Sequence, residues 1–69
     1  MKLYFQNANG KERLISEVKD GDEAYDKIKE FCDERGFKLH YTRQWKTDDG
    51  RTQIDCGSWC EFFYLDEDN

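Results

Sequence analysis

The sequence lacks several features that would point to a membrane, secreted or linker protein. Its 69 residues include no proline, which disfavours a polyproline ligand or a proline-rich linker. No run of about 18 apolar residues occurs, so no membrane-spanning helix is expected, and the first residues lack the apolar stretch of a signal peptide. Three cysteines, an odd number, fit a reducing compartment better than a disulfide framework. We therefore expect a cytoplasmic protein.

The residues and motifs on which enzymes rely are also scarce. The sequence has one histidine and contains no nucleophile motif, no P-loop and no Gly-x-Gly-x-x-Gly pattern. A chain this short buries only about 60% of its extended surface, which leaves little room for a deep pocket. Asp48-Asp49 looks like a carboxylate pair, but it stands in a predicted turn, where Asp is favoured for local hydrogen bonds. We predict neither an enzyme nor a bound cofactor.

Charge and aromatic side chains are abundant. Charged residues make up 39% of the chain, aromatic residues make up 16%, and the formal net charge is −5. The aromatic content argues against disorder. The negative charge disfavours direct binding of nucleic acid, because phosphates are bound by clustered Lys and Arg. It favours a basic protein partner, for example a nucleic-acid-binding protein with a positive groove.

Local patterns predict a hairpin at the start of the chain. Residues 2–7 and 11–18 read as strands, and Asn9-Gly10 between them is a strong hairpin signal because both residues tolerate positive φ. Alternation in the second strand places three side chains on one face: Leu14, Ser16 and Val18.

A helix is predicted over residues 21–35. Asp20 is placed to cap its first turn together with Glu23, and Gly36 stands where a C′ glycine belongs. Four residues recur at helical spacing on its apolar side: Ala24, Ile28, Phe31 and Cys32. Phe37, just beyond the glycine, is expected to pack back on Cys32.

Three further strands are predicted at residues 38–45, 51–56 and 59–65. Residues 46–50 form a turn through Asp49-Gly50, and residues 66–69 form a frayed tail. The element order is ββαβββ. Its simplest arrangement is a single α+β domain over residues 1–69, with the helix packed on one face of a mostly antiparallel sheet.

The predicted helix carries an acidic arc. At about 100° per residue, six carboxylates fall on one side of it: Asp22, Glu23, Asp26, Glu30, Asp33 and Glu34. Carboxylates four residues apart are about 6 Å apart along the axis, similar in scale to phosphates along a nucleic-acid strand. The alternative is a solvated outer face, which any surface helix needs. Like-charge pairs at i,i+4 cost a few tenths of a kcal/mol, which favours a functional reason for the arc.

One short helix covers one face of the sheet, so the other face is expected to expose aromatic side chains. Trp and Tyr are favoured at interfaces, and the candidates are Tyr4, Trp45, Trp59 and Tyr64. Such a face either binds a partner or joins two copies of the chain. The alternative is that strand twist, the tail and long Lys or Arg side chains cover it.

Cysteine spacing raises a third hypothesis, a small zinc-stabilised module. Zinc sites use four ligands, and the candidates would be Cys32, Cys56, Cys60 and His40. Cys32, however, falls on the apolar side of the helix, where a cysteine is more simply a small core residue. Packing is therefore the favoured role of these cysteines, and we predict no metal ligand.

Four segments carry a resemblance that runs over nearly the whole chain: Met1-Lys2-Leu3-Tyr4-Phe5, Ile28 to Glu34, Tyr41 to Trp45, and Glu61 to Leu65. In these segments the chain resembles small acidic proteins encoded by phages and mobile elements of Gram-positive bacteria. The resemblance implies a setting in the host bacterial cytosol. Such proteins include inhibitors of bacterial defence nucleases, among them anti-CRISPR proteins, and several of these inhibitors mimic nucleic acid.

The leading hypothesis joins the resemblance to the acidic arc. It is a phage-derived, anti-CRISPR-like inhibitor that binds a basic nucleic-acid-binding protein such as a Cas nuclease. The residues expected to contact the partner are Asp22, Asp26, Glu30, Asp33, Trp45 and Trp59. The alternatives are a small structural or assembly protein that dimerises through its aromatic sheet face, and the zinc-stabilised module.

Overall fold

The computed structural model describes residues 1–36, 39, 42–57 and 61–67. Within them the elements follow in the order β1 (Lys2–Gln6), β2 (Glu12–Glu17), α1 (Gly21–Glu34), β3 (Arg43–Lys46), β4 (Thr52–Asp55) and β5 (Phe62–Asp66). One helix and a five-stranded antiparallel sheet confirm the predicted α+β class and the order ββαβββ.

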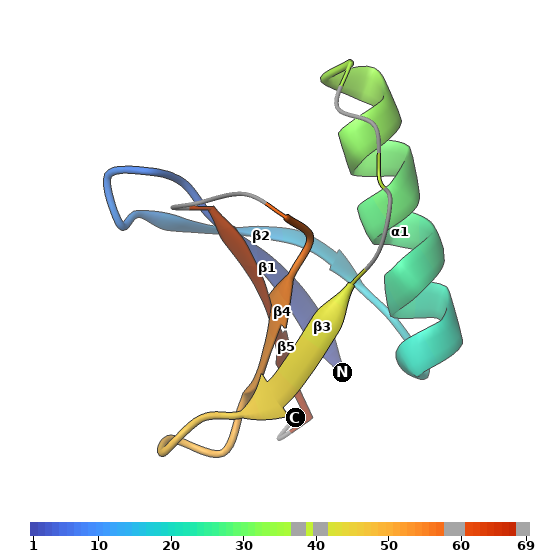
Figure 1. The fold of residues 1–69 in the computed structure, drawn as a ribbon. Coiled ribbons are helices and arrows are strands. Elements are labelled where there is room, and N and C mark those ends of the chain that lie inside the picture. The colour runs from blue at the N-terminus through green and yellow to red at the C-terminus, as the bar shows by residue number, and fades with distance from the viewer. Residues whose placement is uncertain (37–38, 40–41, 58–60, 68–69) are drawn as a thin grey trace.

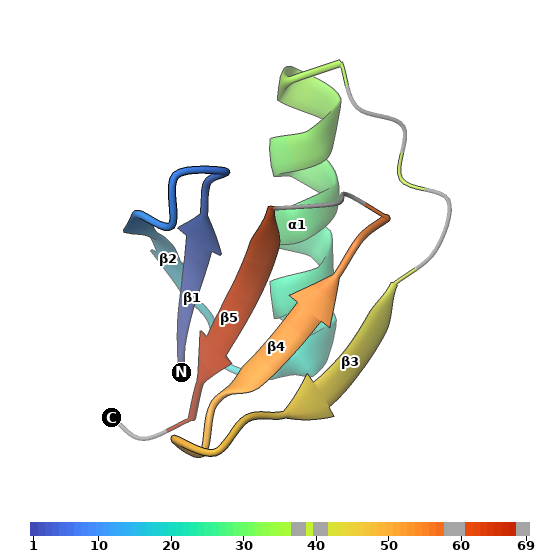
Figure 2. The same ribbon diagram turned by 60° about the vertical axis from the view of Figure 1, so that its left-hand side comes forward.

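The sheet has the strand order β2-β1-β5-β4-β3, and all four pairings are antiparallel. The last strand, β5, is therefore central, between the N-terminal hairpin and the β3–β4 hairpin (Figure 1). Helix α1 lies against one face of the sheet (Figure 2). No other helix or strand of the described residues covers the opposite face, which we call the outer face.

A β-bulge divides the first hairpin. Leu3 pairs with Ser16, but the next residue, Tyr4, pairs with Leu14, so Ile15 is an extra residue on β2. The bulge turns Leu14 to the face opposite to that of Ser16. The prediction that Leu14, Ser16 and Val18 share one face is therefore wrong, because alternation fails across an inserted residue.

Helix α1 begins as predicted and ends one residue early, at Glu34. The Asp20 carboxylate accepts a hydrogen bond of 2.9 Å from the Glu23 backbone N–H, which confirms the predicted N-cap. The Glu23 carboxylate in turn accepts one of 3.2 Å from the backbone N–H of Lys19. Gly36 has a φ of +71°, as a C′ glycine requires. The predicted contact of Phe37 with Cys32 lies outside the described residues.

The strand predicted at 38–45 is shorter and later than expected. It runs from Arg43 to Lys46, while the described residues just before it, Leu39 and Thr42, are not in a strand. β3 is an edge strand whose partner in the sheet is β4, and β4 ends at Asp55, the partner of Arg43. The chain turns after that point, at Gly57, which has a φ of +96°. Thr42, the described residue directly before Arg43, therefore has no β4 residue with which to pair.

The last strand is shifted toward the C-terminus relative to the prediction of 59–65. It runs from Phe62 to Asp66, and Asp66 pairs with Lys2 on β1. Asp66 is therefore part of the sheet and not of a frayed tail, because β1 provides a partner at that position. Glu67, the next residue, forms an ion pair with Lys46.

The core lies between α1 and the inner face of the sheet. Ten buried apolar side chains form one cluster: Leu3, Phe5, Val18, Ala24, Ile28, Cys32, Ile54, Cys56, Phe63 and Leu65. The helix contributes three of them, Ala24, Ile28 and Cys32. Phe31 packs half-buried against the same cluster, and the side of the helix opposite to these residues faces solvent.

Candidate functional site

The acidic arc is the first candidate surface. Asp22, Asp26, Glu30 and Asp33 are all exposed on α1, on the side away from the buried residues of the helix. Glu23, which was predicted to belong to the arc, is half-buried and turns back to accept the hydrogen bond from Lys19. The arc is therefore narrower than predicted, and Glu23 has a capping role.

Little positive charge compensates the arc. The described residues provide it with one ion pair, between Lys27 and Glu30 at 3.8 Å, and both side chains are exposed, so the pair contributes little. The last turn contains no basic residue. Asp33 and Glu34 lie there, where the helix dipole is negative, and each is unfavourable by a few tenths of a kcal/mol. The charge of this surface is not explained by helix stability.

The outer face of the sheet is the second candidate surface. The strand register aligns five side chains in one row across it: Leu14, Tyr4, Tyr64, Gln53 and Trp45. The row lies on the outer face because the neighbours of Gln53 along β4, Thr52 and Ile54, are buried. Leu14 is 52% exposed and Trp45 is 43% exposed, at the two ends of the row.

Arg51 covers the middle of this row. Its guanidinium lies 4.3 Å from the centre of the Tyr64 ring. It also donates two hydrogen bonds to the Glu12 carboxylate, of 2.7 and 3.1 Å, and one of 3.1 Å to Asp49. The Tyr64 hydroxyl donates to the Gln6 side chain at 3.0 Å. The apolar surface is therefore confined to the two ends of the row, which agrees in part with the alternative that long basic side chains cover this face.

The same contacts shift the acidity of the groups involved. The hydrogen bonds from Arg51 hold the pKa of Glu12 below its usual value. The pKa of Asp49 is lowered first by the Thr47 hydroxyl and then by the backbone N–H of Arg51. The pKa of Arg51 itself is raised by the Glu12 carboxylate. Asp49 thus makes local hydrogen bonds within the turn, as the turn interpretation predicted, and in addition an ion pair with Arg51 that was not predicted.

The structure does not bring the predicted contact residues together. Trp45 donates a hydrogen bond of 3.1 Å from its indole N–H to Gln53, on the outer face. The acidic arc lies on α1, behind the opposite face (Figure 2). Trp45 and the arc therefore form two separate surfaces. Trp59 lies outside the described residues.

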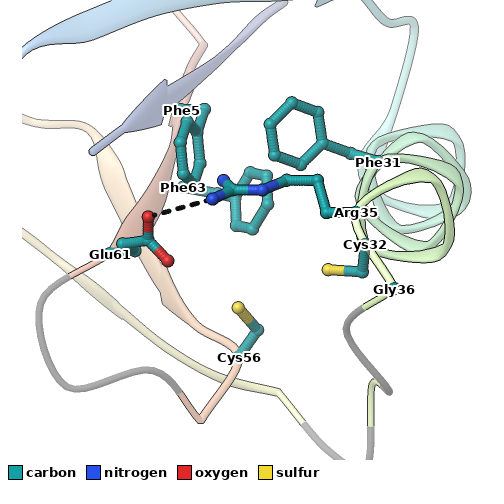
Figure 3. A pocket seen from close by; sticks show the side chains of 8 residues that line it. All are labelled: Phe5, Phe31, Cys32, Arg35, Gly36, Cys56, Glu61 and Phe63. Carbon is teal, nitrogen blue, oxygen red and sulfur yellow. Dashed lines mark hydrogen bonds and ion pairs between the residues drawn. The ribbon is translucent and has the colours of Figure 1, made fainter. Parts of the chain in front are cut away.

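A pocket of about 200 Å³ opens between the end of α1 and the sheet. Figure 3 shows three phenylalanine rings, two thiols and an ion pair around it: Phe5, Phe31, Phe63, Cys32, Cys56, Arg35 and Glu61. The Arg35 guanidinium lies 5.1 Å from the centre of the Phe5 ring and 3.4 Å from the Glu61 carboxylate. Both sulfur atoms point into the pocket (Figure 3).

The two thiols of this pocket are buried. Burial, followed by the adjacent Cys56 thiol, raises the pKa of Cys32 to about 11. A thiol with so high a pKa is a poor nucleophile at neutral pH. His40 and Cys60, the other candidates for a zinc site, lie outside the described residues, and those residues contain no group of three or more potential metal ligands. Two thiols are fewer ligands than a structural zinc site uses.

Two residues of the outer face were missed by the sequence analysis. Leu14 was assigned to the same face as Val18, and nothing in the sequence marks the bulge at Ile15 that separates them. Arg51 was not singled out, because its contact with Glu12 on β2 from a position just before β4 depends on how the strands are ordered in the sheet.

Comparison with known proteins adds no family or function to these surfaces. In the described residues no helix has the length and apolar character that crossing a membrane requires. No protein family, curated protein or solved structure matches the chain.

Proposed function

We propose that the protein is an inhibitor that binds the basic groove of a nucleic-acid-binding protein through the acidic arc of α1. The partner class that fits the resemblance to phage proteins is a bacterial defence nuclease, such as a Cas nuclease. The chain would act without catalysis, by occupying the site that DNA or guide RNA otherwise fills. Its place of action would be the cytosol of the bacterial host.

The observation that carries this proposal is the excess of negative charge on the arc, to which the described residues provide a single exposed ion pair, between Lys27 and Glu30. Asp22, Asp26, Glu30 and Asp33 are exposed on one side of a single helix, and like charges at i,i+4 reduce helix stability. An exposed row of carboxylates is complementary to a groove lined with Lys and Arg, and such complementarity speeds encounter and sets specificity. The tyrosine and tryptophan of the outer face are not needed for this contact.

The test is competition for nucleic acid. A Cas nuclease is mixed with the protein before guide RNA or target DNA is added, and nucleic-acid binding is followed by fluorescence anisotropy. We expect the protein to block loading, with an affinity that falls as the salt concentration rises. The variant with both Asp26→Lys and Glu30→Lys should lose at least tenfold in affinity.

A control variant with the same net charge shows whether the position of the replaced carboxylates matters. Replacing Glu17 and Asp48 by lysine changes two exposed carboxylates outside α1. Each replacement of a carboxylate by lysine changes the net charge by +2, so both double variants have a formal net charge of −1 in place of −5. The control should keep most of the affinity. A tight complex that the Asp26 and Glu30 exchanges leave unchanged would exclude nucleic-acid mimicry by the arc.

A further inference from the structure

The outer face holds two of the three large apolar side chains that are exposed among the described residues. These are Leu14 on β2 and Trp45 on β3, and the third, Tyr25, lies on α1. Leu14 and Trp45 are the first and last members of the row that crosses all five strands. In a two-fold (isologous) dimer both copies use the same surface, so residue i of one copy contacts residue j of the other and residue j of the first contacts residue i of the second. Two exposed apolar side chains placed symmetrically about the middle of a face fit this requirement.

The central strand supplies the symmetry element. Tyr64 on β5 is the third of the five residues in the row, with Tyr4 and Gln53 on its two sides. A two-fold axis along β5 between two facing sheets places Tyr64, with the Arg51 guanidinium over its ring, opposite its own copy. The same axis places Leu14 of one copy against Trp45 of the other, twice per dimer.

The charges of the neighbouring row agree with this axis. That row runs from Glu12 on β2, through Gln6 on β1 and Phe62 on β5, to Asp55 on β4 and its partner Arg43 on β3. Rotation about β5 brings Glu12 of one copy to Arg43 of the other. Both residues already have a partner in their own copy, since Arg51 pairs with Glu12 and the Asp55 carboxylate lies 2.9 Å from the Arg43 guanidinium, so compensated ion pairs meet at both ends of the interface.

The chain has a net charge of −5, so two copies repel each other. Contact between them is most favourable through the face on which that repulsion is smallest. The outer face and the turn beside it carry a smaller net charge, with three cations and five carboxylates: Lys2, Arg43, Arg51, Glu12, Glu17, Asp49, Asp55 and Asp66. Arg51 at its centre pairs with two carboxylates, those of Glu12 and Asp49, so its own positive charge is fully compensated. Sheet-to-sheet contact keeps the two acidic arcs on the far sides of the dimer, where their repulsion is smallest.

From these observations we infer that a second copy of the chain docks on the outer face, in a two-fold dimer in which Leu14 of each copy packs on Trp45 of the other. Five strands spaced about 4.8 Å apart make a face roughly 20 Å wide, and a five-residue strand is roughly 16 Å long. That area is smaller than the 800 Å² or so that each partner buries in a stable complex. The dimer is therefore weak and depends on concentration.

The test is sedimentation equilibrium of the full chain from micromolar to millimolar concentration. The wild type should pass from monomer to dimer, and Leu14→Lys and Trp45→Glu should each weaken association at least tenfold. Both positions are exposed, so folding should survive, which circular dichroism checks. Tyr25→Lys, a change of the same kind on α1, should associate as the wild type does. A wild type that stays monomeric throughout, or that associates equally well with Leu14→Lys, would overturn the inference.

Mixing the two variants tests the pairing itself. In a heterodimer of Leu14→Lys with Trp45→Glu, one end of the interface keeps the original leucine–tryptophan contact and the other end pairs the new lysine with the new glutamate. The mixture should associate at least tenfold more strongly than either variant alone. A mixture no stronger than its components would contradict the two-fold arrangement. Neither experiment uses a nucleic-acid-binding partner, so the result is independent of the proposed inhibition.

Discussion

At the scale of single residues, Arg51 has more contacts on the outer face than the sequence suggested. It connects Glu12, Asp49 and Tyr64, which belong to three separate parts of the chain. Only 21% of its side chain is exposed, so water screens these contacts less than those of an ordinary surface arginine. The exposed aspartates and glutamates of α1, in contrast, have few partners among the described residues. Charged side chains on the sheet therefore contribute to the stability of the fold, whereas the carboxylates of α1 contribute little to it.

Replacing Arg51 by alanine should destabilise the fold by about 1–2 kcal/mol at pH 7, since the variant loses the ion pair with Glu12 and the cation–π contact with Tyr64. The pKa of Glu12 is lowered in the folded state. Its contribution is thus present above the unfolded pKa, about 4.3, and is lost as the pH falls through the folded pKa.

Urea denaturation of the wild type and of Arg51→Ala from pH 7 to pH 3 measures this effect. The difference in unfolding free energy should shrink below about pH 4.3, and the part due to the Tyr64 contact should remain. Lys11→Ala, a change at an exposed cation of the first hairpin, should stay within about 0.5 kcal/mol of the wild type. A difference that does not vary with pH would show that Glu12 has no part in it.

At the scale of elements, local signals succeeded where a single residue determines the structure. The cap at Asp20, the glycine at Gly36 and the turn before Lys11 were all predictable, because each depends on neighbours in the sequence. The bulge at Ile15 and the late start of β3 were not. Both features depend on where the partner strand begins and ends, and the residues of the bulge and of β3 carry no local sequence signal of that position.

Of the two candidate surfaces, one was predictable from the sequence and the other was not. The exposure of the acidic arc follows from helical periodicity alone, so the sequence was sufficient for Asp22, Asp26, Glu30 and Asp33. The composition of the outer face depends on register, and sequence patterns do not specify register across five strands. Trp45 was found because aromatic residues are conspicuous, whereas Leu14 was missed because its place depends on the bulge.

The N-cap of α1 gives a prediction at this scale. Asp20→Ala removes the acceptor of the Glu23 backbone N–H and should cost about 1 kcal/mol, or roughly 4–8 °C in Tm. Asp26→Ala, in the middle of the same helix, should be neutral or slightly stabilising, because alanine is a better helix former and a like-charge neighbour is removed. Thermal unfolding followed by circular dichroism compares the two. Equal losses would mean that Asp20 acts through its charge alone and not as a cap.

At the scale of the whole molecule, the fold separates two surfaces with different physical character. Helix α1 covers the inner face of the sheet, and the acidic arc is on the side of the helix that points away from the sheet. The outer face is on the opposite side of the sheet from the helix (Figure 2). Binding through the arc depends on attraction between opposite charges, whereas contact through the outer face depends on its apolar ends and on charges that are paired within each copy. A dimer of this kind would present two acidic arcs pointing away from each other, so it would bind two basic grooves at once.

This separation predicts opposite responses to salt. Raising the ionic strength from about 0.01 M to 0.15 M shortens the Debye length from about 30 Å to about 8 Å. Attraction between the arc and a basic groove should weaken, since both are exposed and charged. Self-association should strengthen or stay constant, because salt screens the repulsion between two copies of net charge −5 while the contact of Leu14 with Trp45 is apolar. Sedimentation of the protein alone, and anisotropy competition on a Cas nuclease, measure the two responses in the same buffers. If both interactions weakened in parallel, one surface would have to serve both, and the assignment of partner binding to α1 and of self-association to the outer face would be wrong.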